Sequence, residues 1–238
     1  MSTPMRDRLI VALDTDAHTA LSLARTLSGQ VRWVKVGMTL FYAEGPEIVG
    51  RLRDLGFDVF LDLKLHDIPH QAEGAARSVA RLGASMLTVH ASGGVEMMRA
   101  ALEGACEGSQ ECGVDTPDVI GVTVLTSLSD LALAEVGVAT GAAAHASVLA
   151  RAARVAGLQG VVCSPQEARA MRALFGPESL VVTPGVRPRG AEAGDQARTA
   201  TPAEAVAAGA SHIVVGRPIT ASPDPLAAVA ELLSNGEV

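Results

Sequence analysis

The stretch Val59-Phe60-Leu61-Asp62-Leu63-Lys64-Leu65-His66-Asp67 places charged side chains within a run that is otherwise apolar on both alternating faces. A strand that is hydrophobic on both faces is typical of a parallel sheet covered by helices, where an unpaired charge is costly. Asp62 and Lys64 are two residues apart, so both side chains point to the same face of the predicted strand. In a closed barrel that face is the interior. The stretch therefore predicts a buried parallel strand with an ion pair near its end.

Lys64 is one of only two lysines among 238 residues, and the other is Lys35 in Trp33-Val34-Lys35-Val36-Gly37. Seventeen arginines supply the remaining basic side chains. An arginine keeps its proton in a protein, whereas a lysine can release one when its surroundings favour it. The two lysines are therefore candidates for proton transfer. A purely structural network of ion pairs is the alternative interpretation, because such networks also place charges in buried sites.

Strand-like runs alternate with helix-like runs along the whole chain, and this order predicts repeated βα units around a parallel sheet. The predicted strands are 9–14, 33–38, 59–65, 86–90, 119–125, 160–163, 180–184 and 212–216. Helical periodicity lies between them, for example over 72–82 and 146–156. Glycines follow several helical runs, as C-cap glycines do: Gly29, Gly56, Gly83, Gly157, Gly176 and Gly209. Eight units at this length predict an α/β fold with one domain over residues 1–238, a single (β/α)8 TIM barrel.

Composition excludes several classes of function. The net charge is −7, no basic cluster stands out, and one Trp, one Tyr and four Phe offer no base-stacking platform, so nucleic-acid binding is not expected. No apolar stretch approaches the roughly 18–20 residues that a membrane helix needs, and residues 1–8 do not resemble a signal peptide. Cys106, Cys112 and Cys163 form no CxxC pair. We therefore expect a cytoplasmic protein with reduced cysteines and no membrane partner.

Polar side chains gather where the predicted strands end, which is where barrels of this class place their chemistry. These residues are Asp14, Lys35, Lys64, His90, Thr126, Arg187 and Arg217. Arg187 and Arg217 follow the seventh and eighth strands, each with a planar fork suited to phosphate, and Gly216 permits close approach of the backbone. The pattern predicts a phosphate clamp, and the Gly- and Ala-rich segment 187–200 predicts a lid above it.

The stretch 62–69, Asp-Leu-Lys-Leu-His-Asp-Ile-Pro, resembles the signature of the orotidine 5′-phosphate decarboxylase family. Further blocks resemble that family in the same order along the chain: 11–14, 34–37, 89–94, 124–127, 183–187, 194–196 and 215–219. These blocks span almost the whole chain, so the resemblance is specific.

The resemblance implies a TIM barrel that converts orotidine 5′-monophosphate to uridine 5′-monophosphate and CO₂, the last step of de novo UMP synthesis, without metal or cofactor. It implies that Lys64 donates a proton to C6, with Asp62 near the leaving carboxylate and Lys35 between Asp62 and the ribose. Asp67 would reach into the partner's active site, which implies a homodimer. The implied substrate-binding residues are Asp14, Lys35, Asp62, Lys64, Asp67, Ile68, Gln71, Thr126, Pro184, Arg187, Gln196, Gly216 and Arg217.

For three residues, the resemblance also implies which part of the substrate each one contacts. Asp14 would bind a ribose hydroxyl, Thr126 the pyrimidine and Gln196 the phosphate. The family usually has Thr at the position of Gln71 and often Asn at that of His70. Gln71 keeps a donor and an acceptor on a longer side chain, so contacts to the ribose or the dimer seam are expected to differ here.

Three other functions share parts of this pattern. A magnesium-dependent sugar-phosphate decarboxylase or synthase shares the Asp-x-Lys-x-x-Asp motif, but such relatives place a carboxylate where Lys35 stands, and a cation there would repel Mg²⁺. A Schiff-base aldolase needs an uncharged lysine, which flanking aspartates disfavour at Lys64. A non-catalytic nucleotide-binding barrel would keep the arginines but need not keep Asp62, Lys64 and Asp67 together.

Overall fold

Eight parallel strands close into a barrel in the order β1 to β8, in a computed structural model that describes residues 3–187 and 199–236. The strands are β1 (Leu9–Ala12), β2 (Trp33–Gly37), β3 (Asp58–Leu65), β4 (Met86–His90), β5 (Asp118–Val122), β6 (Gly160–Val162), β7 (Leu180–Thr183) and β8 (His212–Val215). The predicted (β/α)8 TIM barrel is confirmed. Several strands are shorter than predicted, most clearly β5, because the apolar pattern continues into loop residues such as Val124 after pairing has ended.

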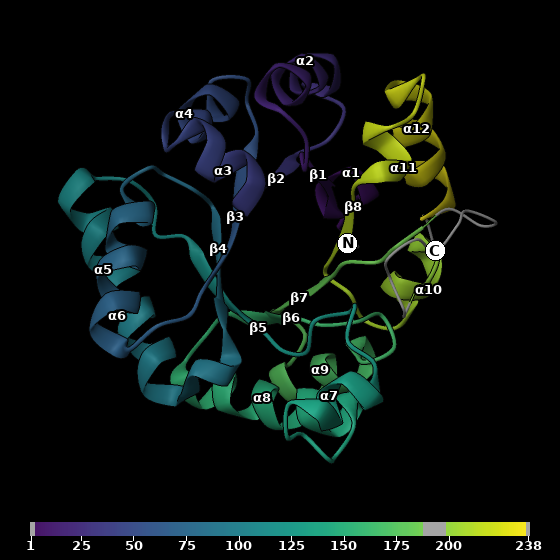
Figure 1. Ribbon diagram of the computed structural model, residues 1–238. Coiled ribbons are helices and arrows are strands. Elements are labelled where there is room, and N and C mark those ends of the chain that lie inside the picture. The colour runs from purple at the N-terminus through teal and green to yellow at the C-terminus, as the bar shows by residue number, and fades with distance from the viewer. Residues whose placement is uncertain (1–2, 188–198, 237–238) are drawn as a thin grey trace.

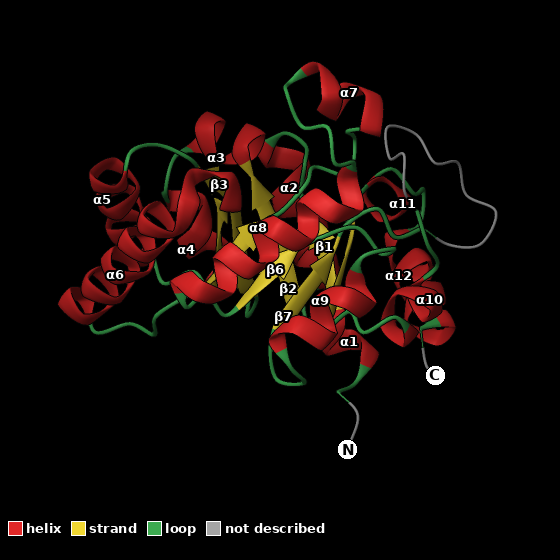
Figure 2. Cartoon of the chain, turned by 90° about the horizontal axis from the view of Figure 1, so that it is seen from below, coloured by secondary structure: helices red, strands yellow, loops and turns green. Residues whose placement is uncertain are grey.

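Helices form a ring around these strands (Figure 1). They are α1 (Met5–Arg8), α2 (Ala17–Leu27), α3 (Met38–Glu44), α4 (Glu47–Arg53), α5 (Pro69–Ala80), α6 (Gly94–Cys112), α7 (Asp130–Glu135), α8 (Ala142–Ala156), α9 (Ala168–Phe175), α10 (Pro202–Ala207), α11 (Arg217–Thr220) and α12 (Pro225–Asn235), with a 3₁₀ turn at Ala91–Gly93. In side view, α7 and α1 lie at opposite ends of the barrel (Figure 2). No helix among residues 3–187 and 199–236 is long and apolar enough to cross a membrane.

Local sequence explains where individual helices begin and end. The predicted helix 72–82 begins earlier, at Pro69, because proline fits the first turn, where its missing N–H costs nothing. The predicted helix 146–156 likewise begins earlier, at Ala142, after Gly141. All six glycines predicted to end helices have positive φ, from 72° at Gly83 to 108° at Gly209. Cys106, Cys112 and Cys163 form no disulfide within residues 3–187 and 199–236.

Buried apolar side chains form two separate clusters. The first comprises alternate strand residues that point into the barrel: Ile10, Ala12, Trp33, Phe60, Met86, Ile120, Val182 and Val214. We call it the inner cluster. Their neighbours on the same strands, such as Leu9 and Val11, belong to the larger cluster between the strands and the helices. The barrel interior is thus a packed core rather than a pore.

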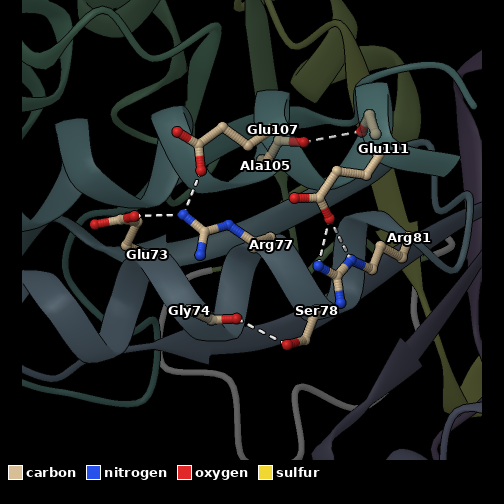
Figure 3. Close-up of polar contacts among 9 residues, drawn as sticks. Glu73, Gly74, Arg77, Ser78, Arg81, Ala105, Glu107 and Glu111 are labelled. Carbon is tan, nitrogen blue, oxygen red and sulfur yellow. Dashed lines mark hydrogen bonds and ion pairs between the residues drawn. The ribbon is translucent and has the colours of Figure 1, made fainter. Parts of the chain in front are cut away.

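Helices α5 and α6 pack together at backbone distance. A Cβ atom at Gly104 or Gly108 would lie 2.2 Å from the carbonyl oxygen of Glu73 or Arg77, so only glycine permits this approach. Two ion pairs then cross the seam, from Arg77 to Glu107 and from Arg81 to Glu111, and Arg77 also pairs with Glu73 within α5 (Figure 3). This packing fixes α5, which starts directly after the loop that contains Asp67.

Candidate active site

A cavity of about 630 Å³ opens at the carboxyl end of the barrel, above the inner cluster. Nine of the predicted site residues line it: Asp14, Lys35, Asp62, Lys64, Thr126, Pro184, Arg187, Gly216 and Arg217. Phe60, Val162 and Val214 from the barrel interior also contribute to its wall. The fold therefore gathers these residues from six strands or their following loops into one concave site.

Four charged side chains form a continuous chain along one side of this cavity. Lys35 Nζ lies 2.8 Å from an oxygen of Asp14 and 3.4 Å from Oδ2 of Asp62, and Lys64 Nζ lies 2.7 Å from the same Oδ2. Negative and positive groups alternate, which satisfies the requirement that buried charges be paired. The predicted ion pair of Asp62 and Lys64 is present, and Asp14, rather than Asp67, supplies the second carboxylate of the chain.

Asp62 is the most enclosed carboxylate of the chain of four. Its side chain is 13% exposed, compared with 54% for Asp14. Burial works against the charged form, but Lys35, Lys64 and a hydrogen bond from Thr88 together hold the pKa of Asp62 below its ordinary value. Asp62 is therefore a fixed negative charge that orients both ammonium groups.

Strand β3 is irregular where it presents Lys64. Pairing with β4 runs from Leu61–Leu87 directly to Leu65–Val89, so β3 contains extra residues at a bulge. Lys64 has φ of 52°, and it is the one non-glycine residue with positive φ in the described part of the chain. This conformation costs about 1–2 kcal/mol in an L-residue and is often found at functional sites. The prediction that simple alternation orients Asp62 and Lys64 is therefore incomplete.

Thr88 on β4 occupies the space opposite the bulge, and sequence reasoning missed it. Its hydroxyl accepts a hydrogen bond from the Lys64 N–H at 2.9 Å and donates one to Oδ1 of Asp62 at 3.1 Å. Its side chain is fully buried. The available signal was a hydroxyl residue between Leu87 and Val89, in a strand otherwise apolar until His90.

Gly37 leaves room for the ion pairs beside it. A Cβ atom at this position would lie 2.7 Å from Asp14 Oδ1 and 3.0 Å from Lys35 Nζ. Its φ of −87° is open to any residue, so the constraint comes from the neighbouring charges rather than from the backbone.

The arginines occupy the wall formed by the loops after β7 and β8. Arg187 is 9% exposed, and burial together with the neighbouring charge of Arg217 lowers the pKa of its guanidinium. Gly216 and Pro184 line the same wall. Two close guanidinium groups suit a dianionic ligand, as the phosphate-clamp prediction requires.

Other predicted site residues lie outside the cavity wall. Asp67, Ile68 and Gln71 are exposed and are absent from the described residues that line the cavity; Asp67 Oδ1 accepts a hydrogen bond from the Ile68 N–H. Gln196, with most of the predicted lid, lies outside the described residues. His90 packs against His66 with ring centres 5.2 Å apart, and burial, His66 and Lys64 lower the pKa of His90.

Comparison with known proteins places this geometry in context. Residues 7–232 match the model of the family described as orotidine 5′-phosphate decarboxylase / HUMPS. An orotidine 5′-phosphate decarboxylase of Anaeromyxobacter dehalogenans is 55% identical over 223 residues, covering 93% of this chain and 95% of the relative. One from Synechococcus sp. is 51% identical, covering 94% and 93%. The crystal structure of orotidine 5′-phosphate decarboxylase from Lactobacillus acidophilus superposes with a TM-score of 0.85 at 38% identity, covering 98% of this chain and all of that one.

Proposed function

This chain belongs to the orotidine 5′-phosphate decarboxylase family, and on that premise we propose that it is the carboxy-lyase that converts orotidine 5′-monophosphate to uridine 5′-monophosphate and CO₂. This reaction is the last step of UMP synthesis. The observation that best supports the proposal is the alternating chain Asp14, Lys35, Asp62, Lys64 in a cavity that also holds two arginines. In this arrangement the charged set faces the reacting carbon, and the two arginines face the phosphate.

Lys64 is proposed as the proton donor. When the bond between C6 and the carboxylate breaks, CO₂ leaves and the electron pair stays in an sp² orbital of C6, outside the ring π system. An ammonium group fixed beside C6 stabilises this charge and then transfers its proton to the carbon. The neutral amine regains a proton from water after product release.

Asp62 and Lys35 hold the donor ready in this proposal. Asp62 Oδ2 contacts both ammonium groups, so Lys64 stays protonated and oriented before substrate binds. A preorganised charge needs little rearrangement during the reaction, and this is a main source of electrostatic catalysis. Lys35 would link Asp62 to a ribose hydroxyl held by Asp14.

The phosphate supplies binding energy away from the reacting carbon. Arg187 and Arg217 would hold it, with Gln196 as a further donor and Gly216 beside it. Energy from this remote contact fixes the pyrimidine against Lys64, while Thr126 and Pro184 line the space for the base.

We propose that the protein acts as a homodimer. Asp67, Ile68 and Gln71 lie on the surface at the start of α5, so we propose that they complete the site of a partner subunit. The packing of α5 on α6 gives this surface a fixed position. We further propose that the chain forms one domain over residues 1–238 and works in the cytoplasm.

A magnesium-dependent sugar-phosphate enzyme is the rival within this barrel family. Its metal would have to share Asp62 with two ammonium groups, Lys35 and Lys64, both within 3.4 Å of one carboxylate oxygen. Hard divalent cations prefer sites built from oxygen ligands, so this cluster favours the decarboxylase.

The proposal is tested by following the loss of orotidine 5′-monophosphate absorbance in excess chelator without added cofactor. Wild type should turn over, whereas Lys64→Arg, which keeps the charge but holds its proton more tightly, should lose activity. Lys35→Arg is the matched control, because it makes the same change at the other lysine of the charged set. It should retain more activity than Lys64→Arg.

Equal activity of wild type and Lys64→Arg would remove Lys64 as the proton donor. No turnover by folded wild type would remove the substrate assignment, and sugar phosphates with Mg²⁺ would be assayed next.

A further inference from the structure

We propose that Thr88 is a positioning residue that sets the orientation of Lys64 and Asp62 for catalysis. This inference rests on the proposed decarboxylase function and adds a residue that does not line the cavity. Thr88 is fully buried on β4, opposite the bulge of β3.

The hydroxyl of Thr88 joins the backbone of one functional residue to the side chain of the other. It accepts from the Lys64 N–H at 2.9 Å and donates to Oδ1 of Asp62 at 3.1 Å. A hydroxyl can do both at once because it has one donor and two acceptor sites. No apolar side chain of the same shape can replace it.

The contact with the Lys64 N–H matters because Lys64 lies outside the regular hydrogen-bond pairing of β3 with β4. Its φ of 52° interrupts regular pairing between Leu61 and Leu65, so the Lys64 N–H lacks the strand partner that a regular register would supply. Thr88 provides an acceptor at this point. A buried donor without a partner is costly, so the hydroxyl stabilises the conformation that aims the ammonium group into the cavity.

The side-chain contact fixes the plane of the Asp62 carboxylate. Oδ1 is bound by Thr88, which leaves Oδ2 facing Lys64 at 2.7 Å and Lys35 at 3.4 Å. Without the hydroxyl, the carboxylate is free to rotate and share its oxygens differently between the lysines. The Thr88 hydroxyl thus positions Lys64 in two ways. It binds the Lys64 N–H directly, and it orients Asp62, which contacts the Lys64 ammonium group.

Two substitutions separate positioning from packing. Thr88→Val keeps the shape and removes the hydroxyl, whereas Thr88→Ser keeps the hydroxyl and removes a methyl group. We expect Thr88→Val to lower kcat by about 10- to 100-fold, the range for hydrogen bonds to charged groups, and Thr88→Ser to stay near wild type. KM should change by less than about threefold, because the phosphate and ribose contacts remain.

Thr183→Val is the matched control. Thr183 is equally buried on β7, and its hydroxyl donates to the His212 carbonyl rather than to the charged chain. Its loss should leave kcat unchanged. If Thr88→Val does not fold, Thr88→Ala removes the same hydroxyl and is compared with Thr88→Ser in its place.

A second readout does not depend on activity. Because the chain has two lysines, protein labelled with [¹⁵N]lysine gives two backbone amide signals, from Lys35 and Lys64. In Thr88→Val the Lys64 amide should shift and exchange faster with D₂O, while the Lys35 amide stays as in wild type. Thr88→Ser should restore the wild-type spectrum.

The outcomes distinguish this inference from the proposed function. Unchanged kcat or an unchanged Lys64 amide in Thr88→Val would overturn the role of Thr88, as would a larger kcat loss in Thr88→Ser than in Thr88→Val. Absence of turnover in wild type would instead overturn the decarboxylase proposal, and the amide measurement would still decide whether Thr88 holds Lys64.

Discussion

The barrel interior differs between its two ends. Toward the start of β2 and β3, the inward side chains are Trp33 and Phe60, which belong to the apolar inner cluster. Two residues further along the same strands, the inward side chains are Lys35 and Asp62. The change occurs over about 7 Å, the rise of two strand residues. We call the two regions the lower and upper ends.

This difference indicates a division of roles along each strand. The lower end removes apolar surface from water and supplies stability. The upper end holds charges and a strained backbone, which stability alone would not select. Substitutions at the upper end should therefore affect mainly activity, and substitutions at the lower end mainly folding.

The largest effect is expected at the upper end. Lys64→Ala removes both the proposed proton donor and the charge beside C6, so kcat should fall by about 10⁴-fold or more. The free energy of unfolding should change by less than about 1 kcal/mol, because Asp62 keeps Lys35 and Thr88 as partners. Steady-state kinetics and urea denaturation at fixed protein concentration measure the two quantities. A large loss of stability with intact kcat would contradict this division of roles between the two ends.

The opposite pattern is expected at the lower end. Ile120 is fully buried in the inner cluster and does not line the cavity. Ile120→Ala should lower the free energy of unfolding by about 2–5 kcal/mol, with kcat per folded molecule within about threefold of wild type. Ile120→Val is the matched control and should cost about 0.5–1.5 kcal/mol. Urea denaturation and kinetics below the transition decide between the patterns.

The lower end should also control stability in mild acid through His212. This half-buried ring lies 5.3 Å from that of Trp33, and partial burial with nearby arginines lowers the pKa of His212 to about 4. In the unfolded chain His212 is protonated once the pH falls below about 6.5, whereas in the folded protein it stays neutral until about pH 4. Folding stability is therefore lost as the pH falls from 6.5 to 4. The loss is about 3 kcal/mol by linkage.

His212→Gln should remove this pH dependence, as measured by urea denaturation at pH 7 and pH 4. His18→Gln, at an exposed position on α2, is the matched control and should keep it. At the upper end the pKa of Asp62 lies below its ordinary 3.8, so the stability that depends on its charge is lost only at still lower pH. If the free energy of unfolding depended on pH equally in wild type and His212→Gln, His212 would not be the group responsible for the loss of stability.

Sequence reasoning recovered the fold and most of the charged site because both follow from periodic patterns. Alternation of strands and helices predicts the barrel, and strand ends then place Lys35 and Asp62 correctly. The bulge at Lys64 follows no period: it depends on the match between β3 and a hydroxyl on β4. Thr88 was missed for that reason, since a threonine in an apolar run looks like an ordinary strand residue.

The smallest effect is expected from Gly37→Ala at the upper end. The new Cβ would lie 2.7 Å from Asp14 Oδ1 and 3.0 Å from Lys35 Nζ, while the φ of −87° imposes no strain. Asp14 is the more exposed partner and can move away, so the 2.8 Å pair should open while Lys35 keeps Asp62. Because Asp14 is proposed to bind the ribose, KM should rise about tenfold with kcat nearly unchanged, the pattern of lost uniform binding.

Gly50→Ala in α4, with nothing within 4 Å of its new Cβ, is the control and should leave KM unchanged and stabilise the helix by about 1 kcal/mol. A fall in kcat with constant KM in Gly37→Ala would instead mean that the whole charged chain moves as one unit, so that the upper end cannot be divided into binding and reacting parts.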